Sequence, residues 1–410
     1  MLAPETQNYA RIRVVGVGGG GGNAVRRMIE AGVVGVEFLA INTDAQALDR
    51  TEADHKLQIG ANLTKGLGAG GDPHVGKAAA EESKQEIMMA LDGSDMIFLT
   101  CGLGGGTGTG ATPIVAETSR SLGALTVAIV TRPFRIEGPR RSQNAEDGYS
   151  RLKEHVDAII VIPNDRLLSV TEKRTSLPEA FRAADNVLVH GVRGISEVIV
   201  IPGLINLDFA DVRAVLANAG TALMGIGIAS GENRASDAAK QAVSSPLLEQ
   251  TIDGAEALLF NVCGPPDIGL SEIQEAAEII TSATQRADPD VLMGAVINES
   301  LEDEVRITVV ATGFDRAAGE ATKASQQRGQ AGAADHSAPL RTQLFRQAYS
   351  GQPLTTTLPA DSMAKPIGHR ADDARAPGLQ SPPFRQAPHP RPHASSADDD
   401  LDIPAFLRKR

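Results

Sequence analysis

Two glycine-rich loops, each between a short apolar run and a helical pattern, carry the residues best suited to chemistry in this 410-residue sequence. The first is GVGGGGGNAVRRMIE over residues 16–30, where Gly16, Gly18 and Gly21 satisfy the spacing G-x-G-x-x-G. Glycine lets the backbone approach phosphate, and the following helix N-terminus offers free N–H groups and a positive dipole end. Alone, this pattern fits NAD, FAD, a nucleoside phosphate, or a tight strand–helix turn without a ligand.

The second loop repeats the order strand, glycine loop, helix in MIFLTCGLGGGTGTGATPIVAE, residues 96–117. Within it, GGGTGTG over 104–110 offers a nest of backbone N–H groups, and Thr107 and Thr109 add hydroxyl donors. Two such nests on neighbouring strands of one sheet can hold a triphosphate between them, whereas a dehydrogenase needs only one. The pattern G-x-x-x-x-G-K-[ST] is absent, which excludes an ordinary P-loop protein.

Phe181 and Asp185 stand four residues apart at the start of a predicted helix, so they share one face. A phenyl ring can stack on a purine, and a carboxylate can accept hydrogen bonds from the N1–H and N2 amino groups of guanine. Adenine lacks that pair of donors, so the carboxylate disfavours it. From spacing alone, ordinary core packing remains the better interpretation of Phe181.

The string NLDFAD over 206–211 sets Asn206, Asp208 and Asp211 around the start of another helix. Ionised carboxylates there can orient and polarise a water for in-line attack on a γ-phosphate. Without further context, helix capping explains the same residues more simply.

Strand and helix patterns alternate through the first 316 residues and predict an α/β fold with a Rossmann-like, doubly wound parallel sheet. A second α/β domain follows a long central helix. Strands are expected near 11–17, 36–42, 96–100, 124–130, 158–163, 221–229, 255–262, 291–297 and 304–312, and helices near 22–31, 75–91, 111–122, 142–155, 233–243 and 270–285, with one more beginning near 206.

The central helix is expected from Pro178, capped by Ser176, to about Ile201, where Pro202-Gly203 stops it. Some 24 residues at about 1.5 Å each span about 35 Å. If the helix is unbroken, the acids of 206–211 cannot reach the nucleotide of their own molecule, but they can reach that of a neighbour stacked head to tail. Such a heterologous contact repeats without closing and builds a filament.

Composition excludes several other classes. The formal net charge is −12 and no long basic run occurs, which disfavours nucleic acid as a partner. The two cysteines, Cys101 and Cys263, cannot form a disulfide framework, so a cytoplasmic location is expected. Neither a signal peptide nor a run of about 18 apolar residues is present, so no membrane span is expected.

The C-terminal quarter differs in composition from the rest. Residues 317–395 hold two Lys, seven Arg and five acids, a net of +4, and 11 of the 23 prolines fall in 317–410. Such a stretch is typical of a disordered linker. The closing DDDLDIPAFLRKR over 398–410 combines an acidic run, a short apolar run and a basic end, which suggests a peptide that orders on a partner.

These strings together resemble a known family. GGGTGTG resembles the signature of the tubulin and FtsZ superfamily, and residues 11–316 look like bacterial FtsZ in GVGGGGGNAV, AINTDAQAL, KGLGAGGDPHVG, RPFRIEG, IPNDRLL and NLDFADVR. The terminal DIPAFLRKR resembles the C-terminal peptide of that family. The expected organisation is a flexible N-terminus (1–10), a GTP-binding domain (11–177), a central core helix (178–203), a C-terminal α/β domain with the catalytic loop (204–316), a disordered linker (317–395) and a partner-binding peptide (396–410).

The resemblance implies the site residues. It implies that the 206–211 loop, with Asn206, Asp208 and Asp211, acts catalytically on the GTP of the adjacent subunit. Without the family, the pair Glu137 and Arg141 would be an ordinary solvated helical pair. The implied nucleotide contacts are Gly19, Gly20, Gly21, Gly22, Asn23, Gly104, Gly105, Gly106, Thr107, Gly108, Thr109, Glu137, Arg141, Asn164, Phe181 and Asp185.

The implied function is a polymerisation-dependent GTPase that forms the division ring at midcell of a bacterium. GTP or GDP and Mg²⁺ are the expected cofactors. The metal follows from the triphosphate, and no protein ligand is assigned, although Asp44 and Asp72 lie in loops that could approach the γ-phosphate. Expected partners are further copies of the chain, assembly regulators, and membrane-associated division adaptors that bind residues 398–410.

Two other functions fit parts of the sequence. A dehydrogenase would bind NAD at the first loop, with Glu37 or Asp44 on the ribose, and leaves GGGTGTG and NLDFAD unexplained. A tubulin-like paralogue without turnover would be favoured by loss of Asp208 or Asp211, and both are present. The sequence departs from the usual family pattern at CGPPDIGL (263–270) and at Gln143-Asn144.

Overall fold

The computed structural model describes residues 10–167, 176–248, 250–286 and 288–314. The expected flexible N-terminus, apart from residue 10, lies outside the described residues, as do the linker over 317–395 and the peptide over 396–410. Among the described residues no helix is long and apolar enough to cross a membrane.

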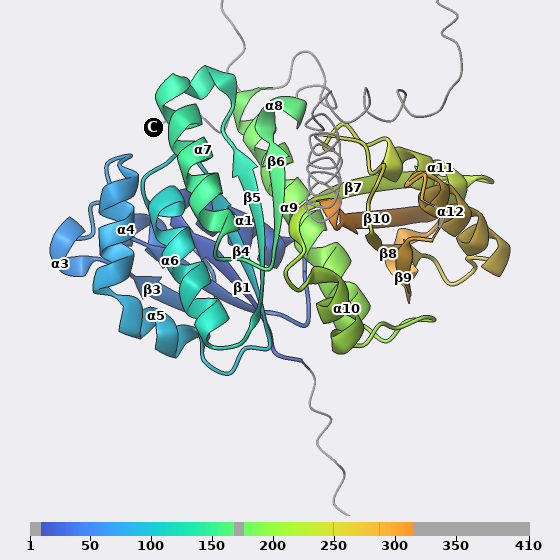
Figure 1. The fold of residues 1–410 in the computed structure, drawn as a ribbon, viewed down its shortest axis with the longest axis horizontal. Helices are drawn as coiled ribbons and strands as arrows, with labels where there is room; N and C mark the ends of the chain where they lie inside the picture. Colours follow the sequence, from blue (N-terminus) through green and yellow to red (C-terminus); the bar gives the residue numbers. More distant parts are fainter. Residues whose placement is uncertain (1–9, 168–175, 249, 287, 315–410) are drawn as a thin grey trace, which may run out of the picture. The chain divides into compact units, whose positions relative to one another are not determined.

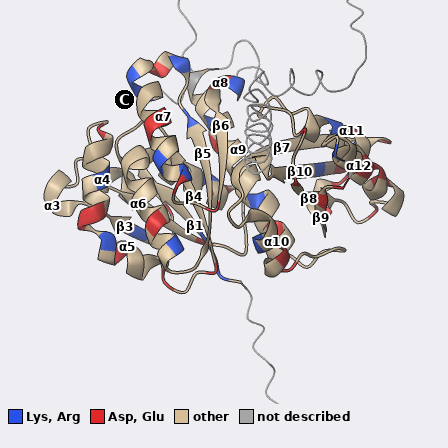
Figure 2. Ribbon diagram, in the orientation of Figure 1, with Lys and Arg blue, Asp and Glu red and all other residues tan. Residues whose placement is uncertain are grey.

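The first half of the chain folds as a parallel sheet, as predicted (Figure 1). Its order is β3-β2-β1-β4-β5-β6, with every neighbouring pair parallel. The central strands are apolar and nearly free of charge, and Lys, Arg, Asp and Glu lie mainly on helices and loops (Figure 2). The strands are β1 (Ile12–Val17), β2 (Glu37–Asn42), β3 (His55–Gln58), β4 (Met96–Gly102), β5 (Leu125–Arg132) and β6 (Ala158–Pro163).

Helices cover both faces of this sheet, because successive strand residues point to opposite sides. In β4, Phe98 joins a core formed with α1 and α9, whereas Leu99 joins one formed with α4 to α7. The helices are α1 (Gly18–Glu30), α2 (Ala45–Asp49), α3 (Ala61–Thr64), α4 (Pro73–Glu82), α5 (Lys84–Leu91), α6 (Thr107–Ser121), α7 (Pro139–Lys153), α8 (Asn164–Leu167) and α9 (Leu177–Val200), with a 3-10 turn η1 (Arg135–Glu137).

The helix expected over 75–91 is two helices, and the prediction of one continuous helix is wrong. The break falls at Ser83, a buried residue with φ −102° and ψ 23°. Its hydroxyl accepts a hydrogen bond from the backbone N–H of Gly60 at 3.1 Å, a contact between residues 23 positions apart. A distant partner thus interrupts a segment whose local pattern is helical.

Helix α9 follows the predicted bounds closely, since it begins one residue before Pro178 and ends one before Ile201. A capping box starts it, in which the backbone N–H and the hydroxyl of Ser176 both donate to Glu179 Oε2 at 2.7 Å. Its 24 residues correspond to about 36 Å of helix.

The second half forms a mixed sheet that continues the first. β10 is antiparallel to β7 and β8, β8 is parallel to β9, and β6 pairs with β7 over three residues. One sheet of order β3-β2-β1-β4-β5-β6-β7-β10-β8-β9 therefore runs through both expected domains. The elements of the second half are α10 (Phe209–Leu216), β7 (Gly220–Ser230), α11 (Arg234–Val243), β8 (Ala257–Gly264), α12 (Leu270–Ser282), β9 (Asp290–Ile297), a 3-10 turn η2 (Glu299–Leu301) and β10 (Glu304–Thr312).

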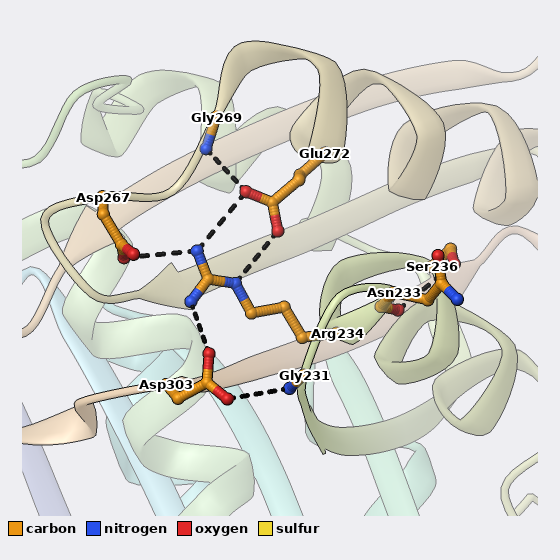
Figure 3. A network of polar contacts seen from close by, with 8 residues as sticks. All are labelled: Gly231, Asn233, Arg234, Ser236, Asp267, Gly269, Glu272 and Asp303. Atoms are coloured by element: carbon orange, nitrogen blue, oxygen red, sulfur yellow. Dashed lines mark hydrogen bonds and ion pairs between the residues drawn. The ribbon is translucent and has the colours of Figure 1, made fainter.

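One buried guanidinium, at the start of α11, joins the loop before α12, the first turn of α12 and the turn before β10 (Figure 3). Arg234, 6% exposed, donates to Asp267, Glu272 and Asp303 at 2.9–3.2 Å. The carboxylates are fixed in turn, because Asp303 accepts from Gly231 N–H and Glu272 from Gly269 N–H. The loop in which the sequence departs from the family pattern thus supplies Asp267 to this network.

Candidate nucleotide site

A cavity of about 360 Å³ opens at the carboxyl edge of the parallel strands, where ligands bind in doubly wound folds. Both glycine loops contribute to its wall, together with the start of α9. The lining residues are Val17, Gly19, Gly20, Asn23, Gly102, Leu103, Gly105, Gly106, Thr107, Gly108, Thr131, Pro133, Glu137, Arg141, Asn164, Phe181, Ala184, Asp185 and Leu188. Twelve of the sixteen predicted nucleotide contacts are in this set.

The two helices that follow the glycine loops, α1 and α6, lack side-chain caps. The N-cap positions of α1 and α6 are Val17 and Gly106, and neither helix has a capping side chain among the described residues. By contrast, α2, α4 and α10 are capped by Asp44, Asp72 and Asp208. The N–H groups of the first turn have no partner within their own helix, so α1 and α6 present two donor sets and two positive dipole ends to one space.

The two glycine loops touch each other, which places both donor sets together. A methyl group added at Gly18, whose φ is +72°, would lie 2.8 Å from the backbone nitrogen of Gly108. The helices also begin earlier than the expected residues 22 and 111, because the glycines themselves form the first turns.

Four predicted contacts lie outside the cavity wall. Gly21 packs its Cα against the carbonyl oxygen of Thr100, so close that an added methyl would be 2.4 Å away. Thr109 is buried, and its hydroxyl accepts a hydrogen bond from Gly104 N–H at 2.8 Å. Gly22 instead lines an adjoining cavity of about 370 Å³. Nucleotide contacts by Gly21, Gly22, Gly104 and Thr109 stay predictions, and the structure gives Thr109 a role in shaping the loop.

The far end of the cavity suits a flat base with hydrogen-bond donors. Phe181 is 40% exposed and packs edge-to-face on the buried Phe134, with ring centroids 5.3 Å apart. Asp185 makes no hydrogen bond to any described residue, and burial raises the pKa of its carboxyl to about 6, against the opposing charges of Arg27 and Arg26. Asn164 is 4% exposed, and its Oδ1 has no hydrogen-bond partner among the described residues. Two acceptors without partners thus line the cavity.

Glu137 and Arg141 form an ion pair of 2.5 Å at the cavity wall. Glu137 also accepts the backbone N–H of Phe134 at 2.9 Å, and its side chain is largely buried. Both carboxylate oxygens are therefore engaged within the chain, while the Arg141 side chain remains about half exposed. The pair is not the solvated helical pair of the alternative interpretation, because Glu137 is largely buried and lies in η1, outside the α7 helix that carries Arg141.

Several wall residues were not predicted, although signals for some of them are in the sequence. Ala184 and Leu188 stand three and seven residues after Phe181, so they share its helical face. Thr131 and Pro133 lie at or just after the carboxyl end of β5, where this fold class places its ligands.

The 206–211 loop lies at the other end of α9 and contributes nothing to the cavity wall. Asn206, Asp208 and Asp211 are all exposed. Asp208 caps α10 through Asp211 N–H at 2.8 Å, and Asn206 Oδ1 accepts Gly203 N–H at 2.7 Å. The capping interpretation is thus correct for Asp208, whose second carboxylate oxygen remains available.

Within the described ranges, no group of three or more His, Cys, Asp or Glu side chains could hold a metal ion. Asp44 and Asp72 each use one oxygen as a helix cap. Mg²⁺ is usually held by phosphate oxygens and water with one or two carboxylates, and a cavity lined by glycine loops fits that mode of binding.

Comparison with known proteins places these features in a family. Residues 11–172 match a family model described as the GTPase domain of the Tubulin/FtsZ family. The chain is therefore a GTPase of the tubulin/FtsZ class. Residues 220–315 match the C-terminal domain of the FtsZ family.

Solved structures identify the branch of the tubulin/FtsZ class to which the chain belongs. An empty FtsZ dimer from M. jannaschii is 48% identical with a TM-score of 0.72, and the match covers 76% of this chain and 93% of that one. A point mutant of FtsZ from M. jannaschii is 49% identical with the same TM-score and coverage. CetZ2 from Haloferax volcanii shares the fold at 23% identity and a TM-score of 0.64, covering 78% of this chain and 99% of that one. The chain belongs to the FtsZ family of cytoskeletal GTPases.

Proposed function

We propose that the cavity binds GTP, with the phosphates at the uncapped starts of α1 and α6 and guanine between Phe181 and Asp185. The observation that supports GTP binding is that one cavity contains both the uncapped N-termini of α1 and α6 and two acceptors without partners among the described residues, on Asp185 and Asn164. Guanine offers the N–H donors that these acceptors lack. Mg²⁺, when bound to the triphosphate, neutralises charge that develops on the γ-phosphate.

Hydrolysis is proposed to occur between two copies of the chain. The acids of the 206–211 loop are separated from the cavity of their own chain by a helix of about 36 Å. In a head-to-tail stack, Asp208 and Asp211 of one copy orient a water against the γ-phosphate held by the next. The water oxygen bonds to phosphorus as the bond to the β–γ bridging oxygen breaks, and one proton of the water passes to one of these carboxylates and on to solvent, so that GDP and phosphate result.

The test is the rate of GTP hydrolysis per molecule against protein concentration, with Mg²⁺ present. A threshold concentration is expected, below which turnover nearly vanishes, because an isolated chain lacks the acids of its neighbour. Sedimentation at the same concentrations should show polymer above the same threshold. A flat specific activity down to concentrations at which the chain is monomeric would contradict the shared site.

In the cell, the filament is proposed to form the bacterial division ring at midcell, in the cytoplasm. Residues 398–410 are proposed to bind a membrane-associated adaptor, since DDDLDIPAFLRKR combines an apolar cluster with charged flanks. Deleting 398–410 should leave GTP turnover within about twofold and abolish capture by the adaptor in a pull-down. Capture that survives the deletion would contradict this assignment.

A further inference from the structure

The segment before the 206–211 loop is bound to the outer edge of β9. Strand β9 is the last strand of the sheet, so its outer edge would otherwise be unpaired. Ile205 forms an antiparallel bridge with Ala295 of β9. Leu204 N–H donates to Ala295 O at 2.8 Å, and Ala295 N–H donates to Ile205 O at 2.9 Å.

Gly203 lies close against the backbone of β9 in this attachment. A methyl group added there would lie 2.2 Å from the carbonyl oxygen of Ala295, a backbone atom that cannot rotate away. The φ of Gly203 lies outside the left-handed region, so the backbone conformation does not itself require glycine. The N–H of Gly203 also holds Asn206 Oδ1 at 2.7 Å. One residue therefore contacts both β9 and the first polar side chain of the loop.

We propose that Gly203 is a positioning residue for GTP hydrolysis, which sets the 206–211 loop against β9 so that its acids meet the γ-phosphate of the next copy. This inference rests on the proposed function. The loop is held on one side by the bridge to Ala295 and on the other by the Asp208 cap of α10. The second half of the chain therefore presents the acids as an extension of its own sheet.

Substitution Gly203→Ala should shift the loop without unfolding the chain. The added methyl must move about 1 Å to reach an ordinary contact distance, and displacements of that size cost on the order of 100-fold in rate. We expect GTP affinity and polymer mass to stay within about twofold of wild type, while turnover per sedimented subunit falls about 10- to 100-fold. Turnover normalised to polymer separates positioning from assembly.

A second variant disrupts the attachment of the 203–205 segment to β9 from the β9 side. Both the N–H and the carbonyl of Ala295 face the 203–205 segment, so Ala295→Pro removes the bond to Ile205 and spares the β8–β9 ladder. It should reproduce the effect of Gly203→Ala. The control is Gly225→Ala, whose methyl would lie 2.0 Å from Ala242 O inside the same half of the chain. That control should lower the melting temperature and leave turnover per sedimented subunit unchanged.

Mixed filaments assign the defect to the chain that supplies the loop. Gly203→Ala subunits keep an intact cavity, so mixing them with Asp185→Ala subunits, which have an intact loop, should restore turnover. Mixing them with Asp211→Ala subunits should not, because both then carry a defective loop. Normal turnover by Gly203→Ala alone, or restoration by Asp211→Ala, would overturn the positioning role, and so would loss of GTP binding in both attachment variants.

The two proposals fail in different ways. If wild-type turnover shows no concentration threshold, or if Asp211→Ala turns over normally, the shared site itself is wrong. If the threshold and the loss in Asp211→Ala both hold while Gly203→Ala and Ala295→Pro turn over at the wild-type rate, the shared site stands and the role of Gly203 is wrong.

Discussion

Replacing Asp211 by alanine should reduce GTP turnover per sedimented subunit by about 10²–10⁴-fold, the range for loss of a positioned acid–base group. GTP affinity should stay within about twofold, because Asp211 lies outside the cavity wall. The physical reason is that the attacking water loses the carboxylate that orients it in the neighbouring copy. Phosphate release and nucleotide binding, measured above the assembly threshold, check the two parts of this expectation separately.

Asp211 is a cleaner probe than Asp208, because the Asp208 carboxylate caps α10 and its loss also weakens that helix. A matched control is Asp237→Ala. Asp237 occupies the first turn of α11 as Asp211 occupies that of α10, so both variants remove one acid from a helix start, worth about 0.3–1 kcal/mol. Equal turnover in the two variants would show that Asp211 serves its helix and not the reaction.

The parallel sheet and the glycine loops could be predicted because short stretches of neighbouring residues determine them. Runs such as MIFLT in β4 are apolar on both faces, and glycine clusters directly after such runs occur where the chain turns into a helix. The break between α4 and α5 could not be predicted, because its cause is a hydrogen bond from Gly60 to Ser83 across 23 positions. The short strand β3, HKLQ, was also missed, since half of it is polar and exposed.

The features of the site also divide into those that local spacing predicts and those that depend on contacts formed in the folded chain. The spacing of Phe181 and Asp185 predicts a shared helical face, and both side chains line the cavity. The hydroxyl of Thr109 accepts from Gly104 N–H in the folded loop, a contact that no spacing rule contains. Donation of its own O–H to phosphate stays a prediction. The close approach of Gly203 to Ala295 joins segments 92 positions apart and depends on sheet order, which the sequence does not state.

Replacing Asp185 by asparagine should lower GTP affinity by about 100-fold or more and bring the GTP-to-ATP preference close to one. Two hydrogen bonds to a charged acceptor are worth about 1.5–3 kcal/mol each, and an uncharged amide loses most of that. The control is Asn186→Ala, the next position of α9, which lies outside the GTP cavity. An unchanged GTP-to-ATP affinity ratio in Asp185→Asn would contradict the role of this carboxylate in base recognition.

In the nucleotide-free chain, replacing Asp185 by asparagine should increase stability, whereas it lowers GTP affinity. The reason is that burial of the Asp185 carboxyl without a partner raises its pKa to about 6. A carboxyl whose folded pKa is raised destabilises the native state above that pKa, and the cost disappears below the unfolded value of 3.8. Nucleotide-free Asp185→Asn should therefore be about 1–3 kcal/mol more stable at pH 7, a range that allows for partial exposure, with the gain shrinking toward pH 4.

GTP binding by the wild type should weaken as the pH falls through about 6, since the guanine donors need the ionised carboxylate. Denaturant unfolding of both forms at pH 7 and pH 4, with GTP titrations at pH 5 to 8, tests both signs. A side chain that served only packing would not lose nucleotide affinity while gaining stability in the free chain. Lower nucleotide affinity together with higher stability of the free chain is the result expected of a carboxylate whose hydrogen-bond donors come from the ligand.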